Sequence, residues 1–204
     1  MEPEFWEARY QAGDTRFDLR GPTVPLVDWL DRSSAAAGRA NAPGRAFVPG
    51  CGRGHDVLEL AGRGWDVLGL DFAPSAIHDA REAAALAKLE SRARFEQRDF
   101  FQLDPAREGT CDLWWENTCY CAIDPVRRDE YASVAARMIR PGGVLLFLVF
   151  PADGRAGGPP FAIDPAELTT RFATDFTLTS MKRPPRPSHA ARAQAEQLAV
   201  LTRK

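Results

Sequence analysis

Apolar and polar residues alternate along the chain with two periods, one typical of strands and one typical of helices. Seven short apolar or alternating runs predict strands, at residues 46–48, 67–70, 94–97, 111–116, 144–150, 176–181 and 197–201. Helical spacing of apolar residues appears at residues 57–61, 77–88 and 131–139. Because strands alternate with helices, we expect an α/β fold whose almost wholly apolar run at 144–150 is a central parallel strand.

Small and turn-forming residues predict the connections between these elements. Residues 24–30 are expected to form a helix, and the small and polar residues at 33–45 are expected to form a loop. A second loop is predicted at 102–109. The glycine pair at the end of residues 140–143 is expected to end the preceding helix before the next strand begins.

The stretch from residue 46 to residue 71 indicates a binding site. Gly50, Gly52 and Gly54 follow the first strand directly, so a ligand can approach bare backbone there. The N–H groups at the start of the next helix would point at that ligand. Asp71 ends the second strand, roughly 20 residues after the first glycine, where a carboxylate can accept hydrogen bonds from both ribose hydroxyls. The stretch therefore predicts a site for an adenosine ligand.

The spacing of the glycines distinguishes between a dinucleotide and SAM as the ligand. A dinucleotide fingerprint has the pattern G-x-G-x-x-G, but His55 stands where its third glycine belongs. The bulk of that side chain would obstruct a pyrophosphate. S-adenosylmethionine (SAM) fits G-x-G-x-G better, because its amino-acid tail is smaller. A dinucleotide site and a glycine-rich turn without a ligand are the alternatives.

Composition and charge narrow the class of protein. With 204 residues the chain is long enough for one domain with a sizeable core, and we expect residues 1–204 to form a single domain. A net charge of −2 and a pI near 6.0 argue against a protein that coats nucleic acid or an anionic membrane. We find no signal peptide pattern and no apolar run long enough for a membrane span. The four cysteines form no C-x-x-C pair, which favours reduced thiols in the cytoplasm and no metal site.

Aromatic residues are concentrated before the first strand. Trp6 and Tyr10 are four residues apart, so a short helix would place both rings on one face, and Phe17 follows them. One interpretation is a helix packed on the core. The other is an aromatic lid over the cofactor within residues 1–30, because ring faces attract the positive charge of a sulfonium.

Later strand ends supply further candidate residues. Asp99 and Phe100 end the third strand, where an acid and a ring can contact adenine, while Phe101 is expected in the core. The segment from Asn117 to Cys121 leaves the fourth strand at the edge that carries the ligand crevice in open α/β sheets. The basic, proline-rich residues 182–192 are expected to form a solvated connection, with a nucleic-acid contact as the alternative.

Four stretches of the sequence carry a resemblance to a known family. They are FWEARYQAGDTRFDLRG, VPGCGRGHDVLELA followed by GLD, WENTCYCAIDPVRRDEYA, and PGGVLLFLVFP followed by GGPPF. Together they resemble the thiopurine/halide/thiol S-methyltransferase family of class I SAM-dependent methyltransferases. The resemblance implies a Rossmann-like sheet of seven strands with helices on both faces and an antiparallel last strand. It also implies a protein that is often monomeric and that takes SAM as cofactor.

The same resemblance implies roles for individual residues. Eleven are expected at the cofactor, namely Trp6, Tyr10, Phe17, Gly50, Cys51, Gly52, Asp71, Phe72, Asp99, Phe100 and Asn117. Gly50 would lie against the methionine part and Asn117 near the methyl group. Asn117 stands where plant halide enzymes have tyrosine and thiopurine enzymes have arginine, so the preferred acceptor stays open.

The expected reaction is methyl transfer to a small soft nucleophile, meaning a thiol, thiopurine, hydrosulfide, thiocyanate or halide. Such acceptors need no strong base, so no catalytic residue is expected beyond weak candidates in Asn117 and Tyr120. Tyr120, Cys119 and Phe161 are the candidates for the acceptor pocket, with at most one of Trp114 and Trp115. The alternatives are an O- or N-methyltransferase, which needs a base, a SAM-binding protein without catalysis, and a nucleic-acid methyltransferase.

Overall fold

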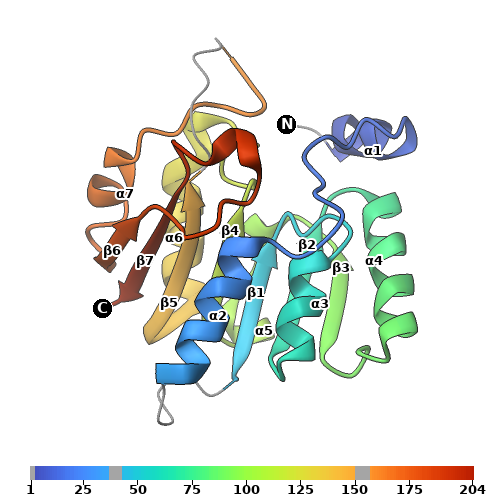
Figure 1. Cartoon of the computed structure of the whole chain (residues 1–204), viewed down its shortest axis with the longest axis horizontal. Helices are drawn as coiled ribbons and strands as arrows, with labels where there is room; N and C mark the ends of the chain where they lie inside the picture. Colours follow the sequence, from blue (N-terminus) through green and yellow to red (C-terminus); the bar gives the residue numbers. More distant parts are fainter. Residues whose placement is uncertain (1–2, 37–42, 150–156) are drawn as a thin grey trace.

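The computed structural model describes residues 3–36, 43–149 and 157–204. Within these residues, seven strands form one sheet in the order β3-β2-β1-β4-β5-β7-β6 (Figure 1). The strands are β1 (Arg45–Pro49), β2 (Asp66–Asp71), β3 (Ala93–Gln97), β4 (Cys111–Asn117), β5 (Ile139–Val149), β6 (Phe176–Lys182) and β7 (Gln197–Arg203). The pairings from β3 to β5 are parallel, and β7 is antiparallel to both β5 and β6. The predicted α/β sheet with an antiparallel last strand is confirmed.

Helices cover both faces of this sheet (Figure 1). They are α1 (Pro3–Gln11), α2 (Val24–Ala36), α3 (His55–Gly62), α4 (Pro74–Ala87), α5 (Pro105–Glu108), α6 (Arg128–Met138) and α7 (Ala166–Thr170). Single 3-10 turns are η1 (Phe100–Gln102), η2 (Pro125–Arg127) and η3 (Ala190–Arg192). Buried side chains of α2, α3 and α4 share one apolar cluster, while those of α6 and α7 share another. The sheet therefore separates two hydrophobic cores.

The two neighbouring tryptophans of β4 show how the strand supplies both cores. Successive side chains of a strand point to opposite faces. Trp114 packs in the cluster of α6 and α7, and Trp115 packs in the cluster of α2, α3 and α4. Both are fully buried. Their opposite orientation was expected, but neither lines the cavity described below.

Three sequence predictions about local structure are wrong at their boundaries. Residues 33–36 continue α2 instead of starting a loop, since alanine and serine extend an existing helix at little cost. Part of the loop predicted at 102–109 is the short helix α5, where the carboxylate of Asp104 accepts the N–H of Ala106 at 2.9 Å. Residues 140–143 belong to β5, where a register shift in the pairing with β4 accommodates them. Phe150, predicted in the same strand, lies outside the described residues.

Candidate functional site

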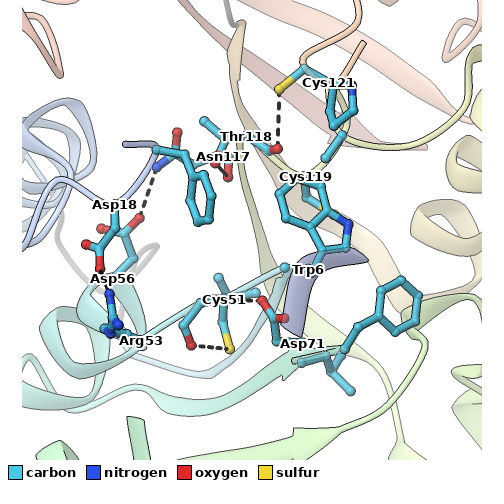
Figure 2. A pocket seen from close by; sticks show the side chains of 18 of the residues that line it. Trp6, Asp18, Cys51, Arg53, Asp56, Asp71, Asn117, Thr118, Cys119 and Cys121 are labelled. Atoms are coloured by element: carbon cyan, nitrogen blue, oxygen red, sulfur yellow. Dashed lines mark hydrogen bonds and ion pairs between the residues drawn. The ribbon is translucent and has the colours of Figure 1, made fainter. Parts of the chain in front are cut away.

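A cavity of about 580 Å³ opens at the carboxyl edge of the sheet (Figure 2). Residues that follow β1, β2 and β4 line it, together with residues of α1. The strand order runs from β1 outward to β2 and β3 on one side and to β4 and β5 on the other. The connections after β1 and β4 therefore diverge, which is where open α/β sheets bind ligands. The volume falls within the usual range of small-molecule sites.

The predicted glycine turn contributes bare backbone to the cavity. Gly50 and Gly52 have positive φ angles of 58° and 52°, which glycine adopts readily. A Cβ atom at Gly50 would lie 3.0 Å from the Cβ atom of Cys119. At Gly52 it would lie 2.8 Å from the hydroxyl oxygen of Tyr10. Side chains at these two positions would therefore collide with Cys119 and Tyr10, so glycine lets the turn pack closely against both of these lining residues.

Asp71 lies beside this turn at the end of β2. Its Oδ2 atom accepts the N–H of Gly52 at 2.9 Å, and its Oδ1 atom accepts the N–H of Ala73 at 2.9 Å. Burial raises the pKa of the carboxyl, while these backbone donors act in the opposite direction. A carboxylate has about four acceptor positions, so Asp71 can still accept hydrogen bonds from a diol in the cavity.

The aromatic N-terminal segment closes one side of the cavity. Trp6, Tyr10 and Phe17 all line it, and both Trp6 and Tyr10 lie 5.6 Å from Phe17 between ring centroids, edge to face. Glu7 of α1 accepts hydrogen bonds from both the N–H and the hydroxyl of Ser75 at the start of α4. These bonds lower the pKa of Glu7. They fix α1 above the sheet edge, where Figure 1 shows it.

Arg53 joins the same segment to the glycine turn. Its Nη1 atom lies 2.8 Å from Asp18 Oδ2, and its Nε atom lies 2.8 Å from Asp79 Oδ2. The guanidinium also lies 5.2 Å from the ring centroid of Tyr10. His55 Nε2 lies 3.2 Å from the other carboxylate oxygen of Asp18. Figure 2 shows Arg53, Asp18 and Asp56 together on one side of the cavity.

Asp56 is a residue of the cavity lining that the sequence analysis did not predict. Its carboxylate accepts the N–H of Thr23 at 2.6 Å, the hydroxyl of Thr23 at 2.8 Å and the indole N–H of Trp115 at 2.7 Å. The Nδ2 group of Asn117 donates to Thr23 Oγ1 at 2.8 Å and reaches Asp56 at 3.5 Å. One carboxylate thus fixes the segment before α2, the end of β4 and the side chain of Asn117. The sequence offers one signal for a role of Asp56 at the cavity, namely its position directly after the glycine turn and His55.

Aromatic rings lie along the part of the cavity near β2 and β3. Phe72, Phe100 and Phe101 line it, although Phe101 is also largely buried, as expected. Asp99 is not in the lining. Its side chain accepts the N–H of Phe101 at 2.9 Å and caps η1.

Two of the three predicted acceptor residues lie outside the cavity. Cys119 lines it, but Tyr120 and Phe161 do not. Tyr120 is fully buried and its hydroxyl donates to Glu167 Oε2 at 3.0 Å, so the hydroxyl is already engaged. Phe161 donates its backbone N–H to the carbonyl of Cys121 at 2.6 Å. This end of the cavity is lined instead by Cys121, Ala122, Ile123, Pro159 and Pro160.

Burial disfavours ionisation of the three thiols in the cavity lining. Cys51, Cys119 and Cys121 all line the cavity. Burial raises the pKa of each thiol, to about 12 for Cys121 and well above the ordinary value for the other two. A protonated thiol is a poor nucleophile, so these side chains act as apolar packing.

Glu116 is a buried carboxyl that supports the lining from behind. It is 1% exposed, and it accepts the N–H of Tyr120 at 2.7 Å and the hydroxyl of Tyr131. Burial raises its pKa to about 7, despite these donors. The residue does not line the cavity, so it is not placed to act as a base on an acceptor.

The raised pKa of Glu116 has a consequence for stability. Between pH 4.5 and 7 the unfolded chain ionises this group while the folded protein keeps it protonated, so the free energy of unfolding falls with rising pH, by about 3 kcal/mol in total. Above pH 7 the contribution is constant. We expect Glu116→Gln to remove this decline. Urea titrations of both proteins at pH 5, 6, 7 and 8 test it, and equal pH slopes would contradict the assignment.

Comparison with known proteins identifies the family. A family model described as thiopurine S-methyltransferase matches residues 1–204. The chain belongs to this family. The predicted resemblance is therefore confirmed, and the protein is a SAM-dependent methyltransferase.

Relatives in the thiopurine S-methyltransferase family differ in the acceptor that their names give. "Probable thiol methyltransferase 2" of Arabidopsis thaliana is 34% identical over 79% of this chain and 68% of its own length. "Thiocyanate methyltransferase 1" of Brassica oleracea is 35% identical over 80% of this chain and 69% of its own. A thiopurine S-methyltransferase of Pseudomonas paraeruginosa is 28% identical, with 90% and 87% covered.

Solved structures agree with the fold of the family. A 1,6-didemethyltoxoflavin-N1-methyltransferase of Burkholderia thailandensis, bound to 1,6-didemethyltoxoflavin and S-adenosylhomocysteine, has a TM-score of 0.73 at 22% identity over 99% of this chain and 86% of its own. The N-methyltransferase NodS of Bradyrhizobium japonicum has a TM-score of 0.67 at 19% identity, with 87% and 93% covered.

The site of this family member fits SAM on the observations above. Gly50 and Gly52 line the cavity without side chains, and Asp71 presents a carboxylate with acceptor positions to spare. Among the described residues, no three His, Cys, Asp or Glu side chains gather as metal ligands would. No helix in the described ranges is long and apolar enough to cross a bilayer.

Proposed function

We propose that this methyltransferase acts on a small soft nucleophile, meaning a thiol, thiopurine, hydrosulfide, thiocyanate or halide. One observation supports this most. One cavity extends from Gly50 and Asp71 to Cys121, Ile123 and Pro160, and Asp124, Arg127 and Arg192 also line it. An acceptor that is already anionic needs enclosure and orientation there more than it needs a base.

In this proposal, different residues of the chain bind the parts of the cofactor. Asp71 binds the ribose hydroxyls and the backbone at Gly50 lies along the methionine part of the cofactor. Phe72 and Phe100 contact the adenine, and Asn117, held by Thr23, lies near the methyl group. Bound SAM supplies a methyl group on a positively charged sulfur. The apolar side chains in the lining, among them Cys121, Ile123 and Pro160, would limit the access of water to that centre, which favours a transition state in which anion and cation neutralise each other.

A turnover panel tests the proposed function. The purified protein with SAM is offered an aromatic thiol, a thiopurine, hydrosulfide, iodide and a catechol, and release of S-adenosylhomocysteine is measured. Turnover of thiols or iodide without turnover of the catechol supports the proposal. Preference for the catechol would instead indicate an O-methyltransferase, for which His55 in the cavity lining is the available base. Tight SAM binding without any turnover would indicate a non-catalytic role.

We also propose that residues 1–30 include a lid over the cofactor, formed by Trp6, Tyr10 and Phe17. Trp6→Ala is expected to weaken SAM binding about tenfold, because a ring face over a desolvated cation contributes about 1–2 kcal/mol. The thermal midpoint should change little, since Trp6 is only half-buried. Calorimetric titration with SAM measures the effect.

Phe5→Ala is the matched control for this prediction. Phe5 is the preceding residue of α1 and is 39% exposed, and it does not line the cavity. Its replacement should leave SAM affinity within a factor of two. Equal affinity in the wild type and Trp6→Ala would mean that α1 is packing only. A monomeric state and a cytoplasmic location stay predictions of the sequence.

A further inference from the structure

A chain of hydrogen bonds at the cavity wall fixes the side chain of Asn117. Asn117, Thr23 and Asp56 all line the cavity. The carboxylate of Asp56 accepts the hydroxyl of Thr23 at 2.8 Å, so the single proton of that hydroxyl is used. Thr23 Oγ1 can then only accept, and it accepts from Nδ2 of Asn117 at 2.8 Å. Because only the NH2 group of an amide donates, this chain determines which way the amide of Asn117 is turned.

The carboxylate of Asp56 at the other end of this chain is held in place. Asp56 lies in the first turn of α3. It also accepts the backbone N–H of Thr23 at 2.6 Å and the indole N–H of Trp115 at 2.7 Å. One of these donors belongs to the backbone and the other to a ring that is fully buried in β4. The fold itself therefore sets the orientation of the Asn117 amide.

The Oδ1 atom of Asn117 has no role in this chain. Within residues 3–36, 43–149 and 157–204, no donor reaches this oxygen, and it is not one of the buried polar atoms that lack a partner. An amide oxygen carries two lone pairs and accepts hydrogen bonds. Asn117 therefore presents an unused acceptor at the cavity wall.

The strand order places Asn117 across the glycine turn from Asp71. Asp71 ends β2, Asn117 ends β4, and β1 lies between these two strands. Neighbouring strands are about 4.8 Å apart, so the two residues are separated by on the order of 10 Å. A Cβ atom at Gly50 would lie 3.0 Å from the Cβ atom of Cys119, so the segment after Asn117 packs directly on the glycine turn. A ribose held at Asp71 would thus have Asn117 on the far side of that turn.

The proposed adenine contacts lie on the opposite side of Asp71. Phe72 follows β2 and Phe100 follows β3, whereas Asn117 lies beyond β1. In SAM the ribose stands between the adenine and the sulfonium. With the ribose at Asp71 and the adenine at these two rings, the sulfonium would lie over the glycine turn, on the side of Asn117.

We propose that Oδ1 of Asn117 faces the positive charge of bound SAM, and that Thr23 is the positioning residue that keeps it there. The inference rests on the cofactor arrangement of the proposed function. A carbonyl oxygen is attracted to a sulfonium and gains much less from the neutral sulfur of S-adenosylhomocysteine. With the amide turned the other way, its NH2 group would face the cation and repel it. The site thus distinguishes the methyl donor from the demethylated product by charge.

Calorimetric titration with SAM and with S-adenosylhomocysteine tests the proposal through the ratio of their two dissociation constants. Asn117→Leu removes the oxygen at similar volume, and the preference for SAM should fall about tenfold, the change that corresponds to about 1.4 kcal/mol. A merely structural role would weaken both ligands equally and leave the ratio unchanged.

Thr23→Val tests the positioning role in the same titrations. The variant keeps the shape of the side chain but removes the hydroxyl that accepts from Asn117. The preference for SAM should fall by about threefold, less than in Asn117→Leu, because Nδ2 still reaches Asp56 at 3.5 Å and retains part of the orientation. Thr23→Ser keeps the hydroxyl and should retain the ratio of the wild type.

Thr179→Val is the matched control for Thr23→Val. Thr179 is exposed in β6, its hydroxyl bonds to that of Thr202 at 3.0 Å, and it is not in the cavity lining. It should bind both ligands as the wild type does. An unchanged ratio in Asn117→Leu would overturn the proposal, because Oδ1 would then face no charge or a group that both ligands share. A wild-type ratio in Thr23→Val would overturn the positioning role.

These titrations separate the inference from the proposed acceptor class. They need no methyl acceptor, so a protein that turns over none of the acceptors offered can still show the loss of preference. An unchanged ratio would in turn leave the acceptor class untouched. Thermal melts show whether each variant is folded, and if Thr23→Val does not fold, Thr23→Ser and Asn117→Leu still decide the result.

Discussion

Alanine in place of Asp71 is expected to weaken SAM binding about 100-fold. Hydrogen bonds to a charged group contribute about 1.5–3 kcal/mol each, and the variant loses the acceptor for both ribose hydroxyls. At the lower end of that range, two such bonds correspond to about 3 kcal/mol, or about two powers of ten in affinity. The change also removes the carboxylate that accepts the N–H groups of Gly52 and Ala73, so the glycine turn loses its anchor. Calorimetry with SAM measures the loss directly.

Asp66→Ala provides the matched control for Asp71→Ala. Asp66 begins the same strand that Asp71 ends, at the opposite edge of the sheet, and its side chain is 44% exposed. Its ion pairs with Arg45 and Arg94 are long, at 3.9 and 3.6 Å, so little stability depends on them. The control should bind SAM as the wild type does. If Asp71→Ala also binds within a factor of two of the wild type, the ribose is not held by this residue.

Removal of the Asp56 carboxylate is expected to cause the largest loss of stability. Asp56→Ala leaves the indole N–H of Trp115 and the N–H and hydroxyl of Thr23 without their acceptor. Trp115 is 0% exposed and lies outside the cavity lining, so water does not readily replace the acceptor of its indole N–H, whereas Thr23 lines the cavity and its two donors can be hydrated in part. At about 1–3 kcal/mol for each buried donor left unpaired, the free energy of unfolding should fall by about 3–5 kcal/mol. The thermal midpoint should fall by on the order of 10 °C for a chain of this size.

Two further variants make the Asp56 result specific. Asp56→Asn keeps one acceptor oxygen and should lose roughly half as much stability as Asp56→Ala. Asp31→Ala removes an acid that is 57% exposed and pairs with Arg63, and it should shift the midpoint by at most about 2 °C. A midpoint for Asp56→Ala within that range would show that these bonds do not stabilise the fold.

The sequence predicts those parts of the site whose geometry depends on residues close together in the chain. A strand followed by Gly50, Gly52 and Gly54 leaves few backbone geometries, and the acid at the end of the next strand must lie beside that turn. Helical spacing likewise places Trp6 and Tyr10 on one face. The order of strands and helices, with the resemblance, predicts the sheet.

Other features depend on contacts between distant residues and have no local signal. Thr23, Asp56 and Asn117 meet across separations of 33 and 94 residues. Tyr120 sits at a turn, where strand alternation no longer fixes a direction, so its placement could not be read from sequence. Arg192 belongs to residues 182–192, which the sequence predicts as a solvated connection, but the fold places it in the cavity lining.

The three thiols of the cavity lining are possible targets of the methyl donor itself. A methyl donor of this kind alkylates any thiolate that meets it in line, and Cys51, Cys119 and Cys121 line the chamber where it would be held. Burial raises the pKa of each, so the walls offer only protonated sulfur. Only a sulfur that enters already ionised can compete for the methyl group. We therefore expect the same desolvation that shapes the chamber to slow methylation of the enzyme's own thiols over repeated turnovers.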